Sequence, residues 1–169
     1  MSQLKSVRRE AAVLIVEDHA PMREAIRVCI EGSFSGLSII EAPDGAAALK
    51  YVEAHSPSLV LMDINLPDAN GLDLTRDILK QWPCTFVAAI SIDTSAALSE
   101  QARAAGAVEF ICKDNLFNTL LPLVGAALTM TNWRNDLECH AAIADESVLY
   151  EGHHAEHLLK TGALAFGQD

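Results

Sequence analysis

Basic and aromatic residues are both scarce in this sequence. Lysine and arginine number 12 against 23 aspartates and glutamates, so the net charge is −11. Such a chain repels phosphate-rich surfaces, and we expect it to bind neither nucleic acid nor an anionic membrane by itself. Aromatic residues make up only 5% of the chain, but hydrophobic residues make up 50%, which is enough aliphatic material for a core.

Long hydrophobic runs and paired cysteines are also missing. No apolar run approaches the roughly 18 residues that a membrane-spanning helix needs. The first residues, MSQLKSVRRE, have no apolar stretch behind their charges, so we expect no secretory signal. The cysteines form no CxxC motif, which predicts reduced thiols and a cytoplasmic protein. They are Cys29, Cys84, Cys112 and Cys139.

Short apolar runs, rich in β-branched residues, alternate along the chain with longer helical patterns. The predicted strands are Ala12–Val16, Leu37–Glu41, Ser58–Met62, Cys84–Ile90 and Ala107–Cys112. The predicted helices are Pro21–Glu31, Asp44–Ala54, Gly71–Gln81, Ser95–Ala105 and Leu116–Met130. Strands that are apolar at consecutive positions are buried on both faces, as in a parallel sheet covered by helices. The pattern predicts an α/β fold, a doubly wound, flavodoxin-like (βα)5 sandwich with a five-stranded parallel sheet.

The helical and strand patterns divide the chain into three parts. Residues 1–11 form an N-terminal extension, residues 12–130 a compact domain, and residues 131–169 an acidic, histidine-containing tail. The tail has weak helical patterns and no recognised output domain. Its HHxxH motif at residues 153–157 lacks a third metal ligand, so a solvated helix is the simpler interpretation. Trp133 and Leu137 could extend the last helix and pack on the domain or on a second copy, which allows a homodimer.

Polar residues follow four of the five predicted strands. Glu17-Asp18 follows the first, Asp63 the third, Ser91 the fourth and Lys113 the fifth. The carboxyl ends of parallel strands meet at one edge of a sheet, where ligands bind. Each residue alone could be a helix cap or a turn residue, but their agreement favours a common site.

Three converging carboxylates repel one another and therefore need a cation. Oxygen ligands favour Mg²⁺, or Mn²⁺ in its place. The cation and Lys113 would neutralise the oxygens of a transferring phosphoryl group, and Ser91 would donate a hydroxyl hydrogen to them. Asp63 is then the predicted nucleophile, giving an acyl phosphate.

Four motifs resemble the response-regulator receiver domains of two-component signal transduction. They are VLIVEDHAPMREAI, LVLMDINLPDANGLDL, AAISID and AGAVEFICKD, within residues 12–130. The resemblance, to single-domain, chemotaxis-regulator-like members, implies Mg²⁺-dependent phosphoryl transfer to Asp63. The donor would be a histidine kinase or a histidine phosphotransfer protein. Phosphorylation would switch a protein–protein interaction surface, at about residues 95–130, toward a downstream protein target.

The resemblance also implies a role for each matching residue of the metal and acceptor site. Asp63 is the phosphoacceptor and a metal ligand. Asp18 is a direct Mg²⁺ ligand, and Glu17 assists it largely through water. Asn65 offers its backbone carbonyl to the metal, and Lys113 contacts Asp63 and a phosphoryl oxygen.

The matching switch and access residues depart from the commonest family pattern. Ser91 is implied as the switch hydroxyl in place of threonine, and Phe110 as the aromatic switch without the usual tyrosine hydroxyl. Ile92 stands where a small residue is common and should crowd the mouth of the site, while Asn65 and Asp93 could hold the hydrolytic water. Lys113 is followed by Asp114 where many receivers have a proline after a cis bond, so this loop is expected to differ.

Other functions fit parts of the same pattern. The chain could be an intermediate receiver of a phosphorelay or, less favoured, an unphosphorylated protein-binding module. A haloacid-dehalogenase-type phosphatase also uses a strand-end aspartate, but it needs a second one two positions on, where Asn65 stands. We therefore expect no enzyme beyond catalysis of its own phosphorylation and dephosphorylation.

Overall fold

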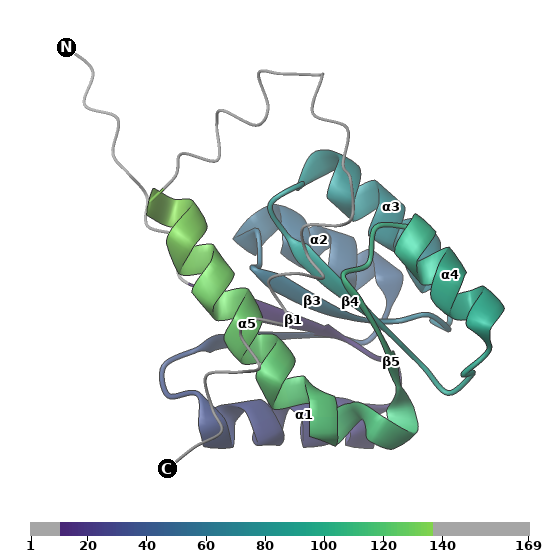
Figure 1. The fold of residues 1–169 in the computed structure, drawn as a ribbon, viewed down its shortest axis with the longest axis horizontal. Helices are drawn as coiled ribbons and strands as arrows, with labels where there is room; N and C mark the ends of the chain where they lie inside the picture. Colours follow the sequence, from purple (N-terminus) through teal and green to yellow (C-terminus); the bar gives the residue numbers. More distant parts are fainter. Residues whose placement is uncertain (1–10, 137–169) are drawn as a thin grey trace.

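The computed structural model describes residues 11–136 of the chain, and side chains are described as far as residue 131 (Figure 1). The predicted N-terminal extension lies almost entirely outside the described residues. Most of the predicted tail also lies outside them, including the HHxxH motif. Predictions about the tail helices and their packing therefore stay predictions.

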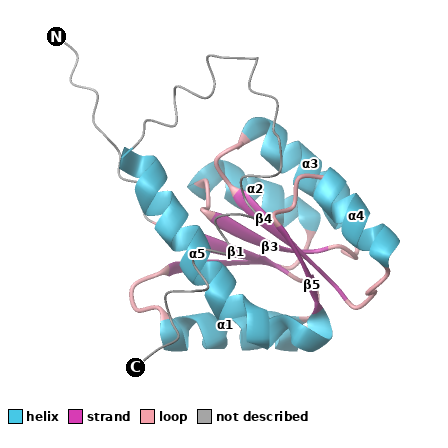
Figure 2. Cartoon of the chain, in the orientation of Figure 1, coloured by secondary structure: helices cyan, strands magenta, loops and turns pink. Residues whose placement is uncertain are grey.

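Five parallel strands form one sheet, as the sequence predicts (Figure 2). They are β1 (Ala12–Val16), β2 (Ser38–Ala42), β3 (Leu59–Asp63), β4 (Phe86–Ser91) and β5 (Glu109–Cys112). The spatial order is β2-β1-β3-β4-β5. The chain builds outward from β1 to β2, then crosses back over β1 to continue with β3. This reversal makes the fold doubly wound and creates a switch point between β1 and β3, where ligands of such sheets bind.

Helices cover both faces of the sheet (Figure 1). They are α1 (Ala20–Ser33), α2 (Gly45–His55), α3 (Gly71–Gln81), α4 (Ala96–Ala104) and α5 (Leu116–Asp136), with a 3₁₀ turn at Lys113–Asn115. One core cluster joins the sheet to α1 and α5, and a second joins it to α2 and α3. In β1, Val13 belongs to the first cluster and Leu14 to the second, so successive side chains alternate between two buried faces. None of the helices in the described part is long and apolar enough to cross a membrane.

The helix boundaries agree with the sequence signals. Pro21 lies in the first turn of α1, where its missing N–H group leaves no helical bond unmade. Asp44 caps α2 and Asn70 caps α3 through side-chain oxygens that accept backbone N–H groups. Gly106, just after α4, has a φ of 97°. Helix α5 continues past the predicted end at Met130 to Asp136.

The loop after β5 and the state of the cysteines were two further expectations. The loop contains no cis peptide bond, since none occurs in the described residues, and Lys113 is the first residue of the 3₁₀ turn. Cys29 and Cys112 carry free thiols as predicted. Cys84 is disulfide-bonded, so the expectation of reduced thiols is wrong for that residue.

Candidate functional site

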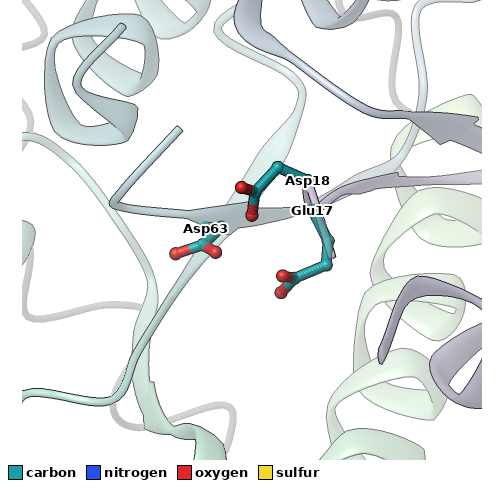
Figure 3. A group of neighbouring side chains, drawn as sticks. All are labelled: Glu17, Asp18 and Asp63. Atoms are coloured by element: carbon teal, nitrogen blue, oxygen red, sulfur yellow. The ribbon is translucent and has the colours of Figure 1, made fainter. Parts of the chain in front are cut away.

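The strand register brings three acidic side chains to one edge of the sheet. Val16 of β1 pairs with Met62 of β3, so the residues that follow them, Glu17 and Asp63, emerge side by side. Carboxylate oxygens of Glu17, Asp18 and Asp63 lie within 4.8 Å of one another. Figure 3 shows them pointing toward a common space beyond the ends of β1 and β3.

Lys113 joins two of these carboxylates. Its ammonium group donates a hydrogen bond to Asp63 Oδ2 at 2.6 Å and another to Glu17 Oε1 at 3.1 Å. Its nitrogen also lies 2.8 Å from Glu17 Oε2. With all three carboxylates ionised, one lysine leaves two negative charges uncompensated within the cluster.

The two acids at the end of β1 occupy different environments. Glu17 is 1% exposed, whereas Asp18 is exposed to solvent. Burial of Glu17 raises the pKa of its carboxyl, and the charge of Asp63 raises it further, although Lys113 opposes both effects. Burial lowers the pKa of Lys113, but its hydrogen bonds to Asp63 and Glu17 outweigh that and the pKa is raised. Lys113 therefore stays charged at neutral pH.

Backbone contacts fix the two strand ends. Arg23 donates a hydrogen bond to the carbonyl oxygen of Glu17 at 2.7 Å. On β3, the backbone N–H of Asn65 donates to Asp63 Oδ1 at 3.1 Å. A Cβ atom at Gly71 would lie 2.1 Å from the carbonyl oxygen of Asp63, so only glycine lets α3 begin so close to this strand end.

A pocket of about 290 Å³ opens at the same edge. It is lined by Glu17, Asp18, His19, Met22, Asp63, Asn65, Ile92 and Lys113. Six of these residues were predicted for the site from the sequence. His19 and Met22 were not, and the signal that could have found them is their position one and four residues after Asp18, at the N-cap and in the first turn of α1.

Ser91, Asp93 and Phe110, which the sequence also predicts for the site, are not among the residues that line this pocket. Ser91 is fully buried, and its Oγ accepts a hydrogen bond from the backbone N–H of Asp93 at 3.0 Å. Asp93 is exposed, and its side chain accepts from Ser95 N at the start of α4. Phe110 is partly buried against a small cluster between the sheet and α4. Ile92 is 71% exposed, so it stands at the rim of the pocket rather than within the core.

The donor set suits a hard divalent cation. Glu17 Oε2 is buried and has no hydrogen-bond partner among the described residues, although the lysine nitrogen lies close to it. The other groups in the pocket that could ligate a metal are the carboxylates of Asp18 and Asp63, Asn65 and the imidazole of His19, so most of them are oxygen ligands. Oxygen ligands with excess negative charge fit Mg²⁺ or Mn²⁺.

Comparison with known proteins agrees with this geometry. Residues 13–124 match the family model of the response regulator receiver domain. The fold is similar to the CheY-like receiver domain protein from Methanospirillum hungatei JF-1, with a TM-score of 0.66 and 25% identity, over 73% of this chain and 98% of that one.

Two curated relatives are transcriptional regulators by name. The chain is 29% identical over 114 residues to the transcriptional regulatory protein DegU of Brevibacillus brevis, covering 66% of this chain and 48% of the relative. It is 36% identical over 101 residues to the transcriptional activator protein ExaE of Pseudomonas putida, covering 60% and 47%. The chain thus spans about half the length of these relatives.

Proposed function

The chain belongs to the response regulator receiver family of two-component signalling, and on this premise we propose that Asp63 accepts a phosphoryl group from a phosphohistidine in a Mg²⁺-dependent reaction. One observation carries the proposal. A buried aspartate at the switch point is hydrogen-bonded to a lysine and lies within 4.8 Å of two more acids. Burying two carboxylates that share one lysine is costly, and a bound cation would offset the excess negative charge of the cluster.

The proposed transfer follows from the groups around Asp63. A carboxylate oxygen of Asp63 attacks phosphorus, the new P–O bond forms as the P–N bond to the donor imidazole breaks, and the imidazole leaves with the bonding electron pair. Lys113 keeps the acceptor oriented through its 2.6 Å hydrogen bond and offsets charge on the phosphoryl oxygens. A cation held by Asp18, Asp63 and the carbonyl of Asn65, with Glu17 assisting, would supply further positive charge there.

Ser91 and Phe110 are the residues proposed to convert the chemistry into a surface change. The Ser91 hydroxyl accepts from Asp93 N, which leaves its own hydrogen free to donate to a phosphoryl oxygen. Phe110 packs against α4 residues through carbon atoms only, so its response would be a change of packing. The affected surface is that of α4, β5 and α5, at about residues 95–130.

The wider assignments rest on family membership. The proposed partners are a histidine kinase or a histidine phosphotransfer protein, and a downstream protein target, with a homodimer as one output. Binding to nucleic acid is not expected from the charge of this chain, although relatives of which the chain covers about half are named transcriptional regulators. A cytoplasmic location stays a prediction, which the free thiols of Cys29 and Cys112 favour and the disulfide at Cys84 does not.

Replacement of the acceptor tests the proposal. The Asp63→Asn protein should show no acid-stable, base-labile phosphoryl label from acetyl phosphate and Mg²⁺, because an amide is a poor nucleophile. Asp77→Asn, an exposed carboxylate on α3, is the matched control and should label like the unaltered protein. Undiminished labelling of the Asp63→Asn protein would place the acceptor elsewhere, and undiminished labelling in excess chelator would refute the role of the metal.

A further inference from the structure

The loop that follows the acceptor is tied to a helix from another part of the chain. Asp68 lies between β3 and α3, yet its carboxylate accepts hydrogen bonds from two backbone N–H groups at the start of α2. Gly45 N donates to Oδ1 at 2.8 Å, and Ala46 N donates to Oδ2 at 2.9 Å. These bonds lower the pKa of Asp68, so the carboxylate is charged over the physiological range.

The first turn of α2 is therefore capped twice. Asp44, its own N-cap residue, accepts from Ala47 N at 2.7 Å. A helix needs partners for its first N–H groups and favours negative charge there, and the two aspartates meet both needs. Only Asp68 comes from outside the helix, so only its bonds fix the position of another segment.

That segment, the loop of residues 64–70, carries groups of the proposed site. It follows Asp63 directly and includes Asn65, whose N–H group donates a hydrogen bond to the acceptor carboxylate. Its neck is closed by the bridge between Asn65 and Asn70 and by the bond from Gly71 N to the carbonyl of Ile64. Asp68 lies at the opposite end of the loop from this neck. The neck joins the two ends of the loop, and the bonds of Asp68 join the loop to α2.

We propose that Asp68 is a positioning residue for the metal and acceptor site, which anchors the loop of residues 64–70 to α2 so that the carbonyl of Asn65 faces the carboxylate cluster. The inference rests on the proposed function, because it assumes that this carbonyl takes part in cation binding. Replacing a group that orients a metal ligand from outside the ligand shell typically lowers metal affinity by about 10- to 100-fold. Asp68 is not among the residues that line the pocket, so it would act through the loop and not as a metal ligand.

Two aspartates at one helix end provide a matched experiment. Asp68→Ala and Asp44→Ala each remove side-chain capping of α2, so both should lower the melting temperature of the full chain. Only Asp68→Ala releases the loop, so it alone should weaken Mg²⁺ binding, by about tenfold in Kd measured by calorimetric titration with MgCl₂. Asp68→Asn keeps one acceptor oxygen and should give an intermediate Kd, which preserves the test if the alanine variant does not fold.

The outcomes distinguish a failure of the positioning role from a failure of the metal site. If Asp68→Ala and Asp44→Ala give the same Kd as the unaltered protein, the positioning role is wrong while the metal site stands. If both variants weaken binding equally, the effect belongs to the stability of α2 and the positioning role is again wrong. If the unaltered protein binds no Mg²⁺ at all, the proposed metal site fails and this inference fails with it.

Discussion

The interior of the sheet is apolar and close-packed, whereas its carboxyl edge contains buried charged groups. Every residue of β1 is apolar and buried, and its side chains need no specific partner beyond close packing. One residue further along, Glu17 is equally buried but charged, and it shares a single lysine with Asp63. The interior stabilises the fold, whereas the edge holds charges whose desolvation opposes folding. The proposed cation would offset the excess negative charge of this edge, so the edge would suit ligand binding at some expense of stability.

The largest expected effect comes from the interior. Leu61 of β3 is fully buried in the core cluster under α1 and α5. Leu61→Ala removes packed methyl groups and leaves a cavity, so the free energy of unfolding should fall by about 3 kcal/mol. Urea unfolding followed by circular dichroism measures it. A loss below about 0.5 kcal/mol, the size typical of a surface substitution, would show that the interior is not close-packed there.

A smaller effect of opposite sign is expected at the edge. Glu17→Gln removes one buried charge and leaves Lys113 paired with Asp63, so in chelator at neutral pH the free energy of unfolding should rise by about 1 kcal/mol. The same urea unfolding, with Glu53→Gln on the exposed face of α2 as control, measures the gain. A loss of stability as large as that of a core substitution would erase the contrast between edge and interior.

The burial of Glu17 also predicts how the stability of the folded protein changes with pH. The pKa of Glu17 is raised in the folded protein above its ordinary value of 4.5 because of burial, so the folded state binds more protons than the unfolded state between the two values. Stability should therefore fall as pH rises from about 4.5 through the raised pKa of the folded state. Glu17→Gln lacks this term, so the difference between the two proteins should be full above that window and vanish below it.

The same contrast explains which parts of the fold and of the site can be predicted from the sequence. Consecutive apolar residues such as Val13 and Leu14 predict a two-sided buried strand, and parallel strands necessarily gather their carboxyl ends at one edge. This was enough to bring Glu17, Asp18, Asp63 and Lys113 into one predicted site. The hydrogen bond between Asp68 and Gly45 of α2 joins residues that are 23 positions apart in the sequence. It depends on where the Asp68 side chain points, which no sequence periodicity predicts.

The smallest effect on stability, and the sharpest test of the boundary between the two regions, concerns Ile92. It is apolar, but it is 71% exposed at the rim of the pocket, so Ile92→Ala should change the free energy of unfolding by no more than about 0.5 kcal/mol. The sequence nevertheless predicts that its side chain crowds the entrance for small donors and for the hydrolytic water. We expect Ile92→Ala to label faster with acetyl phosphate and to lose the label faster, measured as time courses with Mg²⁺. Val28→Ala, which changes an exposed apolar residue on α1, is the control and should leave both rates unchanged.

Equal rates in the Ile92→Ala and unaltered proteins would show that the rim does not limit access. A loss of several kcal/mol would instead place Ile92 in the core, contrary to its exposure.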